Sequence, residues 1–177
     1  MLDGELELTN GELEIESLES ENTTHEEILT EAGGVNARGV EIEFIECTSI
    51  EEAGAVTTAF PHRWSVFNNL ARKWNASCDA ERNEIDLPQA AVLEHVYAQP
   101  DTRSFQTHSK LSSRGREDGE VRNVKRQGFT GTCTYKFKDA SDSIKNAITA
   151  LAKFGQYAGV GSAVARGFGS ISVEVIE

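Results

Sequence analysis

Two Gly-apolar-Gly triplets stand close together in the sequence Gly159-Val160-Gly161-Ser162-Ala163-Val164-Ala165-Arg166-Gly167-Phe168-Gly169. An apolar helical pattern precedes this glycine loop, and an alternating strand pattern follows it. Glycine has no Cβ, so such a loop can take positive φ angles and bring its N–H groups close to a phosphate. The order helix, loop, strand excludes the dinucleotide fingerprint and the P-loop. We therefore interpret it as a phosphate-binding loop or as a tight turn before the last strand.

The segments before and after this loop predict the rest of the fold. Ser141 is a typical N-cap for a helix with apolar residues on one face, and Ser170–Ile176 alternates as a final strand. Upstream, Trp64, Phe67, Leu70 and Trp74 recur at helical spacing after Pro61. The predicted strands are Val40–Cys47, Val92–Ala98 with Ser104–Leu111 after an interruption around Pro100, and Val121–Lys138 with a break at Gly128 and Gly131.

This order of strand, helix, strand, strand, helix, strand predicts an α+β fold. Residues 39–177 are expected to form a ferredoxin-like (RRM-like) βαββαβ domain, in which two helices cover one face of an antiparallel sheet. Residues 1–38 contain less: a hairpin around Asn10-Gly11, and a short helix from Thr24, with Glu27 completing a capping box, to Gly33-Gly34. A hairpin and a short helix are too little for a stable domain.

The net charge of −12 is unevenly distributed along the chain. Residues 1–60 contain 16 acidic residues and one basic residue, a net charge of −15, whereas residues 61–177 contain 13 acidic and 16 basic residues, a net charge of +3. The acidity is therefore regional and leaves a nucleic-acid partner possible. A glutamate-rich chain with only seven lysines is also typical of halophile-like surfaces.

Seven basic residues gather between residues 103 and 126, around a hydrophilic segment, Ser109–Gly119, that we expect to be a loop joining two strands. Basic side chains on such a hairpin can neutralise nucleic-acid phosphates, although a solvated hairpin with scattered charges is the alternative. The candidate phosphate-binding residues are Arg103, Lys110, Arg114, Arg116, Arg122, Lys125 and Arg126 in this segment and Gly159, Gly161, Arg166, Gly167 and Gly169 in the glycine loop.

Other chemistries have little support in the sequence. Asp-x-Asp and His-x-x-His pairs are absent, as is a Gly-x-Ser-x-Gly elbow, so neither a metal site, another cofactor nor a serine hydrolase is predicted. Cys47, Cys78 and Cys133 are isolated and read as buried thiols in a reducing compartment. With no apolar run long enough for a membrane span and no signal-peptide character at the N-terminus, the expected location is the cytoplasm.

Four separated motifs resemble one protein family. They are Phe60-Pro61-His62-Arg63-Trp64 with Leu70-Ala71-Arg72-Lys73-Trp74-Asn75, Gly128-Phe129-Thr130-Gly131, Leu151–Gly161, and Gly167-Phe168-Gly169. In this order they are similar to the C-terminal half of the CRISPR-associated repeat-processing endoribonucleases of the RAMP superfamily, the "Cas six" type. One departure is that the family's segment between the glycine pairs is usually basic and rich in threonine, whereas Arg166 is the only charge here.

The resemblance implies CRISPR repeat RNA as the partner, CRISPR effector-complex proteins as a further class of partner, and a role in antiviral defence. It implies cleavage without a metal, in which a general base deprotonates a ribose 2′-hydroxyl. Residues 1–38 resemble the end of the family's first domain, where the catalytic histidine usually lies. Enzymatic activity is therefore left open, with His62 and His108 as candidate bases. The alternatives are a non-catalytic RAMP-type guide-RNA-binding subunit, or a small-ligand or protein-binding domain.

Overall fold

The computed structural model describes residues 5–8, 11–14, 22–53, 56–78, 80–115 and 121–177. Its main sheet is antiparallel, with the strand order β6-β8-β3-β9. These strands are β3 (Gly39–Thr48), β6 (Val96–Pro100), β8 (Val121–Phe137) and β9 (Ile171–Ile176). With the helices α2 (Arg63–Ser77) and α4 (Asp142–Ala158), they follow each other as β3-α2-β6-β8-α4-β9. The predicted α+β, ferredoxin-like fold is confirmed.

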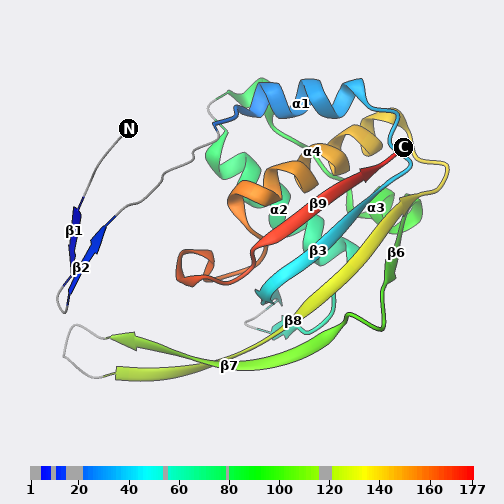
Figure 1. Cartoon of the computed structure of the whole chain (residues 1–177). Helices are drawn as coiled ribbons and strands as arrows, with labels where there is room; N and C mark the ends of the chain where they lie inside the picture. Colours follow the sequence, from blue (N-terminus) through cyan, green and yellow to red (C-terminus); the bar gives the residue numbers. More distant parts are fainter. Residues whose placement is uncertain (1–4, 9–10, 15–21, 54–55, 79, 116–120) are drawn as a thin grey trace.

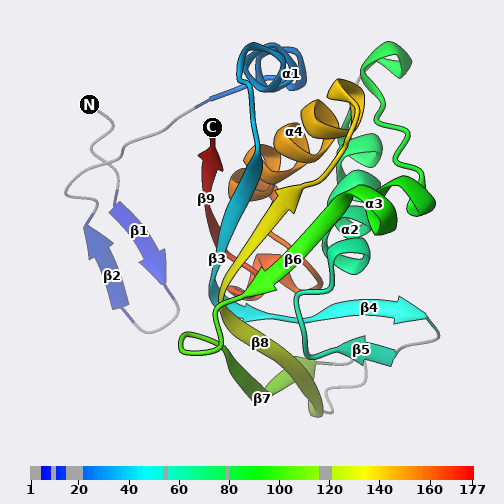
Figure 2. The ribbon, with the colours of Figure 1, turned by 90° about the vertical axis from the view of Figure 1, so that its right-hand side faces the viewer.

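Both long helices lie against one face of the sheet (Figures 1 and 2). Their buried side chains meet the alternating inward residues of β3, which are Val40, Ile42 and Phe44. Ser141 caps α4 by accepting a hydrogen bond from the N–H of Ile144, as its position predicts. The other face of the sheet carries three carboxylates, because Glu41 and Glu43 alternate with the core residues of β3 and Glu174 lies opposite Glu41 on β9. The exposed Lys136 of β8 lies on this same open face.

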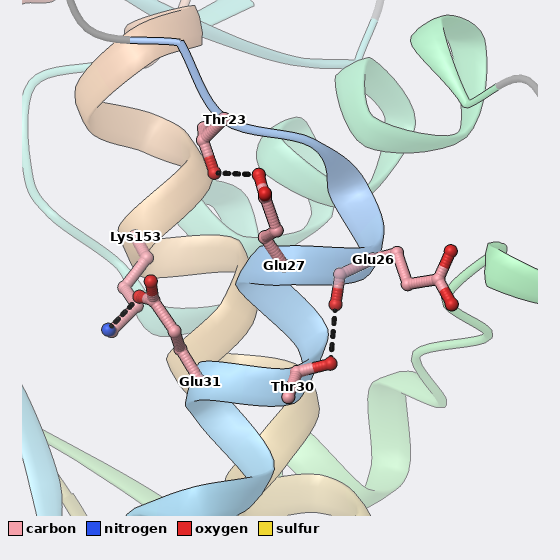
Figure 3. Close-up of polar contacts among 6 residues, drawn as sticks. All are labelled: Thr23, Glu26, Glu27, Thr30, Glu31 and Lys153. Atoms are coloured by element: carbon pink, nitrogen blue, oxygen red, sulfur yellow. Dashed lines mark hydrogen bonds and ion pairs between the residues drawn. The ribbon is translucent and has the colours of Figure 1, made fainter.

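The helix α1 (His25–Gly34) packs against α4 (Figure 3). Its N-terminus has the predicted capping box between Thr24 and Glu27, and Lys153 of α4 forms an ion pair with Glu31 at 2.7 Å. Ile28 and Ala32 belong to the same buried cluster as the sheet. The division of the chain at residue 38 remains a prediction, although α1 itself packs on the larger unit. Nearer the N-terminus, β1 (Glu5–Leu8) and β2 (Gly11–Glu14) pair as a hairpin.

Several predicted elements differ from the structure. Residues 89–95 form a helix, α3 (Gln89–His95), so the prediction of strand from Val92 was wrong and β6 begins at Val96. Alanines and leucine after Pro88 favour a helix that starts directly after proline, and they outweigh one β-branched valine. Pro61 precedes the N-cap His62 and is not in the first turn of α2.

The segment predicted as a loop from Ser109 is strand as far as Gly115, because β7 (Gln106–Gly115) pairs along the first half of β8. The predicted break of β8 at Gly128 and Gly131 is instead an irregularity within one strand, opposite residues 44–48 of β3. A short hairpin that we did not predict, β4 (Ile50–Ala53) with β5 (Val56–Thr58), follows β3. Two 3₁₀ turns, η1 (Glu81–Asn83) and η2 (Val164–Arg166), complete the described elements.

Two buried groups of β8 give the protein an expected sensitivity to high pH. Burial raises the pKa of the Cys133 thiol to about 11, and it raises the pKa of Tyr135 well above its usual value. A group whose pKa is raised by folding contributes stability below its unfolded pKa and loses it as pH rises through the folded pKa. The free energy of unfolding should therefore fall between about pH 9 and 11, by ~2 kcal/mol for Cys133 alone.

Chemical denaturation across this range, with Cys133→Val compared with the original chain, measures the effect. The decline should be shallower in the variant. Cys78→Val is the matched control, because Cys78 is only half-buried. Parallel declines for the Cys133 variant and the original chain would contradict the assignment.

Candidate nucleic-acid interface

The glycine loop joins α4 to β9 and is the orange-to-red segment between them in Figure 1. All four of its glycines have positive φ, from +61° at Gly159 to +83° at Gly161. Ala163 is also in the left-handed region, at +64°. The loop is therefore a chain of left-handed and short 3₁₀ turns, a conformation that non-glycine residues adopt only with strain.

Three of the glycines are required by close packing. A Cβ on Gly161 would overlap the carbonyl oxygen of Ser49, and one on Gly169 would overlap that of Val160. A Cβ on Gly159 would lie 2.8 Å from the side chain of Val164. Gly167 has open space around it and lies beside the exposed Arg166, so these two residues form the accessible tip of the loop.

The N–H groups of the four glycines are already hydrogen-bonded within the protein. Gly161 donates to the side-chain oxygen of Asn69 at 2.8 Å, and Gly169 donates to the carbonyl of Cys47 at 3.2 Å. Gly159 and Gly167 donate to carbonyls within α4 and the loop. The expected approach of these amides to a phosphate would break existing bonds. The glycines thus shape the loop, and its exposed tip is the part that a ligand can reach.

Helix α2 holds the loop in place through side chains that the sequence analysis did not name as candidate site residues. The ammonium of Lys73 donates to the carbonyls of Ala158 and Gly159, at 3.2 and 2.8 Å, where α4 ends. A cation at this position also opposes the negative end of the helix dipole. Burial lowers the pKa of Lys73 below its usual value. Lys73 and Asn69 together hold the start of the loop.

The basic segment forms a two-stranded ribbon, β7 with β8, that extends beyond the main sheet in Figure 1. In its register Lys110 is opposite Arg126, Arg114 is opposite Arg122, and Leu111 is opposite Lys125. Four of the predicted basic residues therefore occupy two opposed pairs of positions. Arg103 is exposed in the turn before β7. The prediction for Arg116 lies outside the described residues.

The glycine loop and the base of the ribbon meet at the same three residues, Cys47–Ser49. On the loop side, Ser162 donates its N–H to the carbonyl of Ser49 at 2.8 Å, and Gly169 donates to Cys47. On the ribbon side, a Cβ on Gly128 would lie 2.5 Å from the carbonyl oxygen of Thr48. The two regions chosen separately from the sequence thus share one scaffold.

The two candidate histidines lie on different elements. His62 is exposed at the N-cap of α2 and lines a pocket of about 230 Å³, next to one of about 280 Å³ that reaches Ser162 of the loop. Glu51 and Arg72 line both pockets. His108 lies on β7, where its Nε2 is 2.8 Å from the Thr130 hydroxyl of β8. The remaining two are structural: His25 packs edge-on against Trp74, and His95 ends α3.

Within the described ranges, no three His, Cys, Asp or Glu side chains lie close enough together to hold a metal ion. No helix among the described residues is long and apolar enough to span a membrane.

Comparison with models of protein families shows which family this chain belongs to. The model of the CRISPR-associated endoribonuclease Cas6 family matches residues 42–171. The chain belongs to the Cas6 family. The match includes β3 from Ile42 onward, the ribbon and the whole glycine loop. A search of curated protein sequences finds no match.

Solved structures of Cas6 proteins share the fold. The product complex of Cas6 (TTHB231) has a TM-score of 0.59 at 17% identity, covering 86% of this chain and 56% of that one. The product complex of Cas6 (TTHA0078) has a TM-score of 0.57 at 20% identity, covering 82% and 56%. The structure of Thermus thermophilus Cas6 (TTHB231) has a TM-score of 0.58 at 15% identity, and the match covers 82% of this chain and 57% of that one. The chain thus spans little more than half the length of these relatives.

Proposed function

We propose that this chain is the C-terminal, RNA-positioning part of a metal-independent Cas6 endoribonuclease that cleaves CRISPR repeat RNA into mature guide RNAs. The observation that carries the proposal is the convergence of the glycine loop and the β7–β8 ribbon on Cys47–Ser49. A single RNA strand following the ribbon towards the sheet would reach the glycine loop, whose exposed tip is Arg166 and Gly167. Both regions belong to the segment that matches the family.

The charge distribution supports this location for the RNA. The open face of the sheet presents Glu41, Glu43 and Glu174, which repel phosphates and outnumber Lys136 on the same face. The ribbon carries the two opposed pairs of basic positions. Affinity for nucleic acid depends on neutralising phosphates with Lys and Arg, so the ribbon rather than the open sheet face is the binding surface. The setting is the cytoplasm, and the product RNA would pass to CRISPR effector-complex proteins.

For catalysis, His62 is the better placed of the two histidines. It lies in a pocket that adjoins the loop, whereas a ring nitrogen of His108 is already in contact with Thr130. Glu51 and Glu52 on the wall of the same pocket oppose the approach of a phosphate. This combination favours a second function for the isolated chain, a non-catalytic RAMP-type subunit that holds guide RNA.

Replacing Lys125 and Arg126 with alanine is expected to make the slope of log affinity against log salt concentration less negative by roughly one to two. Each neutralised phosphate contributes about −0.7 to −0.9 to that slope. Binding of fluorescent repeat RNA, titrated at several potassium salt concentrations, measures it. Lys136→Ala with Lys138→Ala is the matched control, because these exposed lysines lie at the far end of β8 and just beyond it. An unchanged slope in the ribbon variant would show that these charges do not contact RNA.

A further inference from the structure

We propose that Phe60 is a stacking platform for one unpaired base of the bound RNA. The inference rests on the proposed function and adds a subsite to it. Phe60 is a large aromatic side chain that is 44% exposed, two residues before the N-cap of α2. It lies between the pocket of His62 and the base of the ribbon.

The ring of Phe60 is the outer end of a series of aromatic rings that begins in the core. The ring centres of Phe60 and Phe105 are 5.6 Å apart, and Phe105 stacks on the buried Phe129 at 5.8 Å with an angle of 27°. Phe129 in turn meets Phe44 edge-on at 4.9 Å. The exposed ring thus packs on the half-buried Phe105, which in turn packs on the fully buried rings of the core.

The backbone of Phe60 is held as firmly as its ring. Its N–H and C=O both bond to the hydroxyl of Thr58, at 3.2 and 3.1 Å, and its carbonyl accepts a further hydrogen bond from the N–H of His62 at 2.8 Å. Pro61 restricts the conformation of Phe60, and the buried hydroxyl of Tyr135 donates to the Pro61 carbonyl. A platform that is ordered before binding loses little conformational entropy when a ligand arrives.

The neighbouring turn supplies positive charge. Arg103 is exposed two residues before Phe105, and the N–H of Arg103 is bonded to Asp101 in a turn that is tied to β8. The ribbon with its basic positions starts at the next residue, Gln106. An exposed aromatic ring beside a basic track is the usual arrangement for binding single-stranded nucleic acid, since the ring stacks on a base while cations hold the phosphates. Bases in a duplex expose only their edges, so the occupant is an unpaired nucleotide.

The test measures binding of the whole chain to a single-stranded RNA of roughly 12 nucleotides, within the range that such surfaces cover. Phe60→Leu should weaken binding about 5- to 150-fold, the effect of losing one base–aromatic stack. Because no cation is removed, the slope of log affinity against log salt should not change. Phe60→Trp should restore binding, and Tyr97→Leu, which removes a more exposed ring from β6, should have no effect.

A second measurement distinguishes stacking on one base from nonspecific binding of the RNA. With 2-aminopurine at successive positions of the RNA, one position should be quenched by the original chain and not by Phe60→Leu. An abasic nucleotide at that position should abolish the difference between the two proteins. A DNA strand of the same sequence should lose affinity to the same extent in Phe60→Leu, because stacking involves only the base. A loss of affinity that occurs with RNA but not with DNA would overturn a purely stacking role.

The two proposals fail in distinguishable ways. If the original chain binds RNA with a steep salt dependence and Phe60→Leu binds equally well, the platform is wrong and the proposed function stands. If the original chain binds no RNA, both are overturned. Thermal denaturation of each variant confirms that the exposed substitution leaves the fold intact.

Discussion

Replacing Gly169 with alanine is expected to destabilise the folded chain by about 3–5 kcal/mol. The residue has a φ of +72°, where an L-residue costs roughly 1–2 kcal/mol, and its Cβ would overlap the carbonyl oxygen of Val160. The same segment is joined by the hydrogen bond from the Val160 N–H to the Gly169 carbonyl. The substitution therefore forces the two ends of the loop apart. Denaturation with urea gives the change in the free energy of unfolding.

Gly167→Ala is the matched control for this prediction. Gly167 has nearly the same φ, +78°, but nothing would lie within 4 Å of an added Cβ. Only the conformational cost of the left-handed backbone remains, roughly 1–2 kcal/mol. Equal losses for the two variants would show that the positive φ, and not the close approach of Val160, is what demands glycine in this loop. A Gly169→Ala chain as stable as the original would contradict the observed loop geometry.

The 177 residues by themselves are expected to cleave repeat RNA about 10²- to 10⁴-fold more slowly than Cas6 (TTHA0078) assayed in parallel as the reference enzyme. That range is the usual contribution of general-base assistance. The resemblance places the family's catalytic histidine upstream of the matched residues 42–171, and His108 is in contact with Thr130. Single-turnover cleavage of labelled repeat RNA in the presence of a chelator measures the rate.

Fast, chelator-resistant cleavage that leaves a 2′,3′-cyclic phosphate would refute this prediction. His62→Ala and His108→Ala would then identify the base, and the pocket beside the glycine loop favours His62. A rate unchanged in both variants would show that neither His62 nor His108 is the base. RNA binding should survive in all of these variants, because positioning a phosphate needs no proton acceptor.

The elements that the sequence predicted well depend on neighbours along the chain. The capping box of Thr24 and Glu27, the N-cap Ser141 and the alternation of β3 and β9 each act within a few residues. The wrong predictions also came from judging each segment by its own composition. One valine in Gln89–His95 weighed too heavily against its helix-forming neighbours, and the polar composition of Ser109–Gly115 hid a strand that β8 pairs with residue by residue.

The site residues divide in a similar way. The four glycines and the basic segment were chosen by composition and spacing, and their role in binding remains a prediction. Asn69, Lys73 and Phe60 carried no signal of their position in the site. Lys73 reaches a carbonyl 86 residues away, and Asn69 reaches an amide 92 residues away. Such contacts depend on how α2 packs beside α4, which no local pattern records.

The sequence alone therefore determined the order and type of most elements, the ferredoxin-like connectivity and the resemblance to the Cas6 family. Short-range periodicity and capping suffice for these, because hydrogen bonds within helices and the two faces of a strand are set by residues close in sequence. Only the tertiary structure decided that Cys47–Ser49 supports both loop and ribbon and that the glycine amides are already bonded. It also decided that Phe60 caps a series of rings from the core. Each depends on atoms from distant segments reaching contact distance, and packing of the whole core sets those distances.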